Sequence, residues 1–400
     1  MSSESQIPIA AKVASRRFAA RLAAFYATLF GVTGVQLPFF TVWLKAIGID
    51  ATWIGIITAV PPVTRFTVLP MVTAAAERRQ MLRGAIIATA FATALGFALV
   101  GTQHQPFLVL ALYALTCCVW TPMVPLTDAY ALRGVRQYGL NYGPLRLWGS
   151  AAFVVCALIS GLLLGYVAEI HLIWIITAVT VIGALVSLTL QPLQRPKAAA
   201  APAAGARKLL RDPAFLAIIV TSALIQSSHS AYYIFASIAW QQAGLNGLTI
   251  AGLWVLGVVA EIVLFALSPR FTLPPAILVV VAAASAVARW SITAQDPPLP
   301  ILAIVQLGHG LTFGLTQVGI MGLMVHHVPA HIMARGQGYL AACGGIVAST
   351  TSILCGMVYA RYGLGAYYMM AAMAGTGGLA MWLARKRFTA TSSEAGPGSR

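Results

Sequence analysis

Charged side chains are scarce in this chain, where Asp, Glu, Lys and Arg make up 8% of 400 residues. A soluble domain usually carries about 25%, so the composition excludes an ordinary soluble fold. The five cysteines lack the spacing of zinc ligands, and we interpret them as small packing residues. No segment fits the phosphate-binding pattern G-x-x-x-x-G-K-[ST], which argues against an ATP-driven pump.

Apolar residues dominate instead, at 59% of the chain, with a mean hydropathy of +0.84. They form runs of roughly 20 residues, the length that a helix needs to cross a hydrocarbon core of about 30 Å. Backbone groups cannot stay unpaired in lipid, and the runs lack a barrel's alternation, so helices are expected. We predict an all-α polytopic membrane protein with transmembrane helices at 19–43, 51–74, 84–101, 107–130, 145–166, 172–190, 214–240, 248–267, 276–294, 301–326, 337–360 and 365–384.

The basic residues predict the orientation of these helices. With the N-terminus placed in the cytoplasm, most of the 25 Lys and Arg fall in cytoplasmic segments, and only Lys45 and Arg361 fall on the opposite side. This asymmetry predicts that both termini are cytoplasmic. The basic residues are scattered over short loops, so we do not expect binding of nucleic acid.

A Pro-, Ala- and Lys/Arg-rich stretch, "QPLQRPKAAAAPAAGARKLLRDP", occupies residues 191–213. It predicts a cytoplasmic linker between an N-terminal six-helix half (1–190) and a C-terminal half (214–400). This layout is typical of transporters that are built from two related halves with the substrate between them. Without an ATP site, a proton gradient is the expected energy source.

Four charged residues fall inside the predicted bilayer: Arg65 in the second span, Asp128 late in the fourth, Glu261 in the middle of the eighth and Arg289 in the ninth. A charge at the bilayer centre costs at least about 2.5–3.5 kcal/mol, so such residues usually face a cavity and serve transport. The alternative is a structural clamp between helices or, for Glu261, a permanently protonated carboxyl. If Glu261 and Arg289 touch, a substrate that competes for Arg289 would release the carboxylate to take up a proton.

Two polar stripes mark further candidates. Gln306, His309 and Thr312 recur every three residues in "VQLGHGLTFG", on an otherwise apolar helix. His309 is a candidate for proton transfer, or a hydrogen-bonded structural histidine. We also expect Gln306 and His309 to contact substrate.

The second stripe lies in "QSSHSAYYIFASIAW", where Gln226, His229 and Tyr233 share one face, with Tyr232 adjacent. Such a face suits a pocket for an aromatic ring, or hydrogen bonds between helices. Arg65 lies inside the second predicted span, as a substrate ligand or as the partner of a loop or carbonyl.

Taken together, these features resemble the major facilitator superfamily and, within it, the bacterial 3-phenylpropionate:proton symporters, which are relatives of the lactose permeases. The segments that carry the resemblance are "LPFFTVWLKAIGI" (37–49), "VPLTDAYA" (124–131), "YGPLRLWGSAAFV" (142–154), "SHSAYYIFASIAWQQAG" (228–244), "GLWVLGVVAEIVLFALS" (252–268) and "VQLGHGLTF" (305–313). They are spread over both halves and identify a subfamily better than a substrate.

The resemblance implies roles for several residues. Asp128 and Arg146 stand where lactose permeases pair an acid and an arginine at the sugar site, and Trp148 lies in the "RLWGS" form of the family. Glu261 stands at a substrate-linked glutamate, and Arg289 at the arginine that drives deprotonation.

The same resemblance places His309 at the histidine of permease helix 10, with two departures nearby. Thr312 replaces the proton-carrying glutamate of the permeases, and Gln306 replaces a lysine. The proton would therefore ride on Glu261, with or without His309, or on Asp128.

We expect a proton-coupled symporter of the bacterial inner membrane that imports a small aromatic carboxylate by alternating access and acts as a monomer. Arg289 or Arg65 would receive the carboxylate, and Tyr232, Tyr233 and Trp148 would line the ring. The alternatives are a sugar or nucleoside symporter, or a drug:proton antiporter of the same fold. We expect no enzymatic activity, no metal and no cofactor besides the proton gradient.

Overall fold

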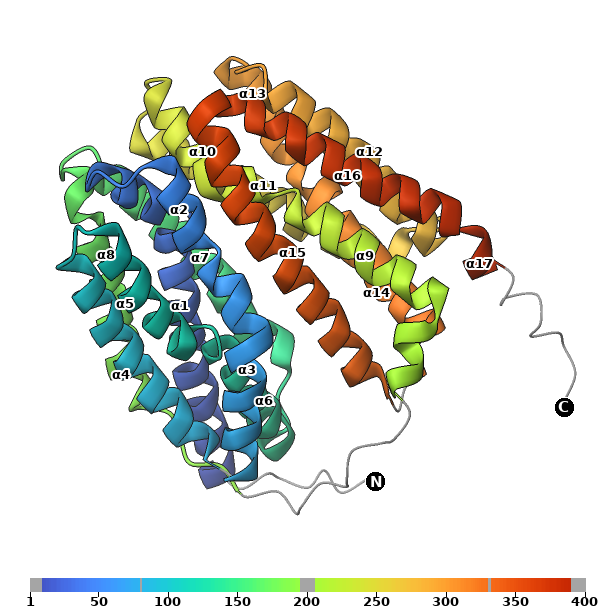
Figure 1. The fold of residues 1–400 in the computed structure, drawn as a ribbon. Helices are drawn as coiled ribbons and strands as arrows, with labels where there is room; N and C mark the ends of the chain where they lie inside the picture. The colour runs from blue at the N-terminus through green and yellow to red at the C-terminus, as the bar shows by residue number, and fades with distance from the viewer. Residues whose placement is uncertain (1–8, 80, 195–205, 330–331, 390–400) are drawn as a thin grey trace, which may run out of the picture. The chain divides into compact units, whose positions relative to one another are not determined.

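The computed structural model describes residues 9–79, 81–194, 206–329 and 332–389, and their regular elements are helical throughout (Figure 1). In chain order these are α1 (Ile9–Ala46), α2 (Ala51–Thr58), α3 (Val60–Arg78), α4 (Leu82–Gly101), α5 (Pro106–Trp120), α6 (Met123–Tyr138), α7 (Tyr142–Leu163), η1 (Glu169–His171), α8 (Leu172–Ser187), η2 (Ala206–Arg211), α9 (Pro213–Ser227), α10 (Ser230–Gln242), α11 (Gly247–Leu267), η3 (Ser268–Arg270), α12 (Pro275–Thr293), α13 (Leu299–Leu307), η4 (Gly310–Gly314), α14 (Leu315–His327), α15 (Met333–Tyr362), η6 (Gly363–Gly365), α16 (Ala366–Ala384) and α17 (Lys386–Thr389).

Within these residues, eleven helical segments are long and apolar enough to cross a membrane. The last segment, Arg335–Ala384, contains both α15 and α16, which are separated by a turn where Gly363 has a φ of 53°. Each of the twelve predicted spans therefore corresponds to helix, and the predicted all-α polytopic fold is confirmed.

Several spans are broken rather than continuous. The second predicted span divides at Ala59 into α2 and α3, just before Pro61 and Pro62, and the fourth divides into α5 and α6 at Thr121 and Pro122. Proline has no N–H to donate, so it fits the first turn of a helix without the loss of a hydrogen bond. The prolines therefore mark the points at which a second helix begins.

The chain forms two compact units, which we call unit 1 and unit 2. Unit 1 comprises Met1–Ile49, Thr67–Ala199 and Asn246–Ala251, and unit 2 comprises Asp50–Phe66, Ala200–Leu245 and Gly252–Arg400. Thus α2 groups with helices from the C-terminal part of the chain. The predicted division at 1–190 and 214–400 stays a prediction, and residues 195–205 of the predicted linker lie outside the described residues.

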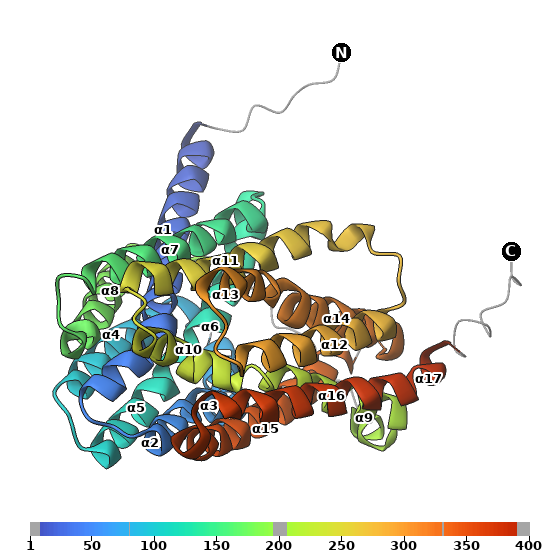
Figure 2. The ribbon, with the colours of Figure 1, turned by 90° about the horizontal axis from the view of Figure 1, so that it is seen from above.

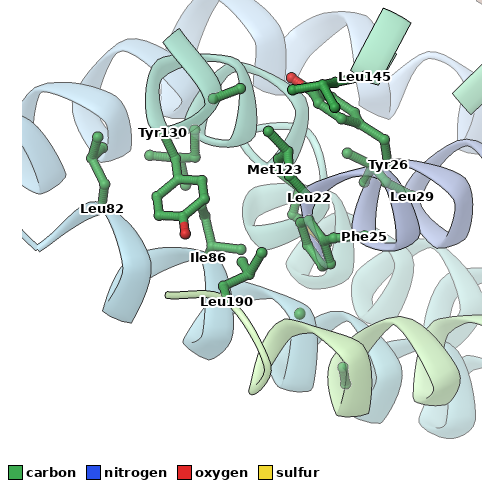
Figure 3. Packing of buried hydrophobic residues seen from close by; sticks show 14 of the residues in the cluster. Leu22, Phe25, Tyr26, Leu29, Leu82, Ile86, Met123, Tyr130, Leu145 and Leu190 are labelled. Carbon is green, nitrogen blue, oxygen red and sulfur yellow. The ribbon is translucent and has the colours of Figure 1, made fainter. Parts of the chain in front are cut away.

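Unit 1 is organised around α1, which packs against α7 and α8, while α4 packs against α5 and α8. Figure 3 shows the apolar core that α1 shares with α4, α6 and α7. Its labelled members are Leu22, Phe25, Tyr26, Leu29, Leu82, Ile86, Met123, Tyr130, Leu145 and Leu190. Burying side chains of this size holds the helices at a fixed spacing and so fixes the polar groups that α1, α6 and α7 carry.

In unit 2, α12 lies along α16, and α9 lies along α15 and α16 (Figures 1 and 2). The apolar core of this unit includes Phe215 and Ile218 of α9, Val279 of α12, and Ile320 and Met324 of α14. It lies toward the end of the unit where α9 begins and α14 ends, which leaves the other end of α12 to carry polar side chains.

Glycine allows the closest approaches between helices. A Cβ at Gly55 of α2 would lie 2.6 Å from the carbonyl oxygen of Ser352 and 2.8 Å from Cα of Gly356, both on α15. In unit 1, a Cβ at Gly161 of α7 would lie 2.4 Å from the carbonyl oxygen of Gly247. Small residues at such contacts let helix backbones meet in a membrane.

Candidate functional site

Arg289 is the centre of a buried polar cluster in unit 2. It projects from α12 and is 4% exposed. Its Nη1 donates to Nδ1 of His309 over 3.0 Å and to Oγ1 of Thr312 over 3.1 Å, and its Nη2 donates to Oε1 of Gln306 over 3.1 Å. All three partners come from the predicted polar stripe, so the structure joins that stripe to the intramembrane arginine.

The stripe is presented by an irregular helix. After α13 ends at Leu307, residues Gly310–Gly314 form a π-helix, η4, before α14 begins. A π-turn adds a residue to one helical turn and is frequent at functional sites. Gly310 lies directly against α11, because a Cβ there would be 2.7 Å from the carbonyl oxygen of Ala260. This close approach brings His309 next to the acidic residue of α11.

Glu261 contacts His309 rather than Arg289. Its Oε2 lies 3.7 Å from Nε2 of His309, and no ion pair joins Glu261 to Arg289, both of which lie in the described part of the chain. The sequence left open whether Glu261 and Arg289 touch, and in the structure the ring of His309 lies between them. Since a guanidinium only donates, Nδ1 of His309 is an acceptor and the proton of the neutral ring lies on Nε2, facing Glu261.

Arg289 thus keeps a positive charge among neutral hydrogen-bond partners. An imidazole, a hydroxyl and an amide surround it, and its Nε is buried without a hydrogen-bond partner. Leaving a buried polar group unpaired costs about 1–3 kcal/mol, and more when the group is charged. The guanidinium of Arg289 therefore has one unused donor and no opposite charge among its hydrogen-bond partners.

Aromatic rings enclose the guanidinium. Its carbon lies 4.7 Å from the ring centre of Tyr232 and 4.5 Å from that of Trp290. Tyr232 also packs on Trp254 with ring centres 4.6 Å apart, and Tyr233 stacks on Trp254 at 6.1 Å. The structure therefore brings together both predicted tyrosines. Trp254 and Trp290, which we did not predict, had no signal that set them apart from membrane-interface tryptophans.

His229 lies at the edge of the same cluster. Its Nε2 is 3.1 Å from Oγ1 of Thr312, and its ring stacks beside Tyr233 with centres 5.9 Å apart. Gln226 instead donates to Gln317 over 3.3 Å. The predicted stripe of "QSSHSAYYIFASIAW" thus turns one histidine and two tyrosines toward Arg289.

A second, separate cluster lies in unit 1. Asp128 of α6 accepts from the hydroxyls of Tyr26 over 2.6 Å and Tyr142 over 2.9 Å, and its Oδ1 lies 3.9 Å from Nε of Arg146. The guanidinium of Arg146 lies over Phe30 at 3.7 Å. The predicted pair is thus close in space, and the carboxylate is satisfied by hydroxyls that no local sequence pattern pointed to.

Of the two remaining predicted residues, Trp148 lies apart from these clusters, whereas Arg65 lies close enough to Tyr233 to interact with it electrostatically. Trp148 is 60% exposed and makes no hydrogen bond or ring contact within the described chain. Arg65 is exposed on α3 within unit 2. A cavity in unit 1, of about 220 Å³, lies beside Arg83, Tyr130 and Arg133 and is lined by none of the predicted site residues.

Residues 19–370 match the profile of the MFS_1 like family. The chain is 32% identical over 362 residues to the probable 3-phenylpropionic acid transporter of Escherichia coli strain K12, covering 88% of this chain and 94% of that protein. It is 26% identical over 354 residues to the maltose permease of Geobacillus stearothermophilus, covering 86% of this chain and 89% of that protein.

Solved transporter structures share the fold. The crystal structure of the nucleoside transporter NupG matches with a TM-score of 0.82 at 14% identity, covering 92% of this chain and 99% of that chain. The inward-open xylose transporter XylE of E. coli matches with a TM-score of 0.68 at 10% identity, covering 92% and 96%. At these identities the similarity concerns the fold alone.

Proposed function

Since the chain belongs to the MFS_1 like family, and is therefore a membrane transporter and not an enzyme, we propose that it imports a small aromatic monocarboxylate, such as 3-phenylpropionate, together with a proton. The substrate class is supported by the relative named as a probable 3-phenylpropionic acid transporter. The mechanism is alternating access, as in secondary transporters that are built from two halves.

The observation that carries this proposal is the environment of Arg289. A buried cation costs several kcal/mol unless an opposite charge compensates it, and the described partners of Arg289 are all neutral. A substrate carboxylate would supply the missing charge, with Nε and one Nη donating side by side in the bidentate geometry that guanidinium groups favour. A sugar or another neutral substrate would leave the cation uncompensated.

The aromatic rings around Arg289 support a substrate with an apolar ring. Tyr232, Tyr233 and Trp254 offer flat faces beside the guanidinium, and offset or tilted ring pairs stabilise by about 0.5–1.5 kcal/mol beyond their buried area. In 3-phenylpropionate a short methylene chain separates the carboxylate from the ring. Such a molecule places its charge on Arg289 and its ring against these faces.

The proton is carried by His309 and Glu261 in this proposal. In the arrangement described above, Arg289 donates to Nδ1 of His309 and so occupies that nitrogen. A carboxylate that draws Arg289 away leaves Nδ1 open to a proton, and the imidazolium that forms faces the Glu261 carboxylate across 3.7 Å. One anion and one proton then bind together, so transport carries no net charge.

Uptake into proteoliposomes tests this function. Radiolabelled 3-phenylpropionate should accumulate when an inward proton gradient is imposed, and an imposed membrane potential alone should not drive it. Excess unlabelled aromatic acid should compete, whereas sugars and nucleosides should not. Absence of accumulation contradicts the proposal, and substrate efflux coupled to proton entry would identify the drug:proton antiporter instead.

A sugar or nucleoside symporter is the second candidate, supported by the cluster around Asp128. A carboxylate beside Arg146, with two tyrosine hydroxyls, offers donors and acceptors that suit a polyol. The similarity to a maltose permease is consistent with it. Competition by sugars in the assay above would favour this candidate.

We also propose that the protein lies in a bacterial inner membrane as a monomer with both termini in the cytoplasm. The support for this orientation is the distribution of Lys and Arg among the loops. Cysteine-accessibility labelling at both ends of the chain in intact cells and inverted vesicles tests it.

A further inference from the structure

The break between α9 and α10 is held by polar side chains. The amide of His229 donates to the carbonyl of Gln226 over 3.2 Å, one residue short of the α-helical partner. The carbonyl of Ile225 thereby loses its helical donor and accepts instead from Oγ of Ser228 over 2.7 Å and from Nδ1 of His229 over 3.2 Å. Insertion of side chains into the helical ladder is a known cause of sharp bends.

The proton positions around His229 follow from donor and acceptor rules. Nδ1 of His229 faces only carbonyl oxygens, those of Ile225 and Gln226, so it carries the proton. Nε2 of the neutral ring is then an acceptor, and its partner is the hydroxyl of Thr312 at 3.1 Å. Thr312 in turn accepts from Arg289 over 3.1 Å. The result is a series of hydrogen bonds in which each group donates to the next, a directed chain from Arg289 through Thr312 to His229 and on to the carbonyls of Ile225 and Gln226.

Thr312 can direct its single hydroxyl proton in two ways. In the directed chain the proton points at His229, and the alternative acceptor is the backbone carbonyl of His309 at 3.3 Å. Donation from Arg289 polarises the hydroxyl and strengthens the bond to His229, because hydrogen bonds in series reinforce one another. If Arg289 turns to a bound anion, the hydroxyl loses its donor and the bond to the carbonyl of His309 becomes competitive.

We infer that Thr312 is a positioning residue that transmits occupancy of Arg289 by an anion to the break between α9 and α10, through His229. The inference rests on the proposed role of Arg289 as the anion ligand. An anion at Arg289 weakens the hydrogen bonds that Nδ1 of His229 donates to the carbonyls of Ile225 and Gln226. The break between α9 and α10 then opens more readily. Substrate binding is thereby coupled to a movement of the helix.

Hydrogen exchange of the purified, full-length protein tests the link between Thr312 and the hydrogen bonds of His229 without any ligand. Thr312→Val keeps the shape of the side chain and removes the hydroxyl, so amides at 225–233 should exchange roughly two- to tenfold faster, as expected for the loss of one hydrogen bond. Thr312→Ser keeps the hydroxyl and should restore the wild-type rate.

Thr316→Val is the matched control. Thr316, on α14 directly after η4, is equally buried, but its hydroxyl donates only to the backbone carbonyl of Thr312, over 2.6 Å. It should leave exchange at 225–233 unchanged. Equal rates in Thr312→Val and wild type, or an equal increase in Thr316→Val, overturn the inference.

A second measurement separates this inference from the proposed function. In the wild type, 3-phenylpropionate should speed exchange at 225–233, and Thr312→Val should bind it while losing that response. If the wild type does not bind 3-phenylpropionate, the proposed substrate is wrong. In that case Arg289→Gln tests the coupling without a ligand. This variant removes the donor to Thr312 and should speed exchange at 225–233, whereas wild-type exchange rates in it contradict the coupling.

Discussion

The two polar clusters of this protein differ in how their charges are compensated. Around Asp128 in unit 1, two tyrosine hydroxyls and the guanidinium of Arg146 satisfy a carboxylate that is about one-third exposed. Around Arg289 in unit 2, a nearly fully buried guanidinium has only neutral partners, and the nearest carboxylate, Glu261, reaches His309 instead.

The difference indicates which cluster needs a charged ligand. A carboxylate with hydroxyls, a cation and partial access to solvent is stable by itself. A buried cation without a counter-charge raises the free energy of the substrate-free state, and an anionic substrate lowers it again. This comparison supports the proposal that the Arg289 cluster binds the charged group of the substrate, while the Asp128 cluster supports the structure or binds hydroxyls.

The largest expected effect is that of Arg289→Gln. It should lower uptake of 3-phenylpropionate on the order of 100-fold, because one partner of a buried charge pair is lost with the substrate bound. Arg146→Gln should cost less than about tenfold, because its ion pair is part-exposed. Initial-rate assays in proteoliposomes measure both. A larger loss in Arg146→Gln would move the substrate site to unit 1 and favour a sugar or nucleoside.

Glu261→Gln should separate proton coupling from binding. Accumulation driven by a proton gradient should vanish, while exchange of labelled for unlabelled substrate across the membrane should persist, since exchange needs no net proton movement. Asp128→Asn is the matched variant and should keep accumulation. Undiminished substrate-driven proton uptake in Glu261→Gln would remove Glu261 from the mechanism.

Tyr26→Phe tests the role of the cluster around Asp128. It removes the shorter hydrogen bond to Asp128 and should lower the free energy of unfolding by about 1.5 kcal/mol, as for a hydrogen bond to a charged group. Uptake of the aromatic acid should change only a few-fold. Thermal unfolding in detergent measures the first effect, and a collapse of transport in a stable variant would show that the Asp128 cluster binds substrate.

The smallest expected effect concerns the hydrogen-bonded pair of Asp212 and His327. Asp212 caps α9, accepting from the amide of Ala214 over 3.0 Å, and is hydrogen-bonded to His327 at the end of α14. Burial raises the pKa of Asp212, but the hydrogen bonds from His327 and Ala214 outweigh burial and hold that pKa below its usual value. The stabilisation is therefore present at neutral pH and lost as the pH falls below about 4.

Asp212→Asn keeps the helix cap, since asparagine caps as well as aspartate, and removes only the charge. It should lower stability by at most about 1 kcal/mol at pH 7, and the difference from wild type should disappear in acid. Thermal unfolding across pH provides the measurement. A difference that persists at low pH would assign the effect to the cap instead.

The sequence predicted the membrane helices and the polar stripe well, because both depend on local pattern. Runs of apolar residues must be helical in lipid, and Gln306, His309 and Thr312 repeat at a spacing that puts them on one face. The family resemblance added the pairing of Asp128 with Arg146, which lie 3.9 Å apart at their closest side-chain atoms.

The contacts of Glu261 could not be predicted in the same way. The carboxylate and Arg289 are on neighbouring predicted spans, which suggested a direct pair. The π-helix at Gly310–Gly314 and the contact of Gly310 with α11 place His309 between them. A change of helical phase of this kind depends on packing against another helix, and no spacing along the chain reveals it.

The sequence by itself determined that this chain crosses a membrane repeatedly as helices and that a few ionisable side chains are buried with it, because hydrophobic burial and backbone pairing follow from composition and local order. Only the tertiary structure decided which charges have partners: Asp128 meets Tyr26, 102 positions away, and Arg289 meets neutral groups. Electrostatic energy depends on distances of a few ångströms between residues far apart in the chain, and packing alone sets those distances.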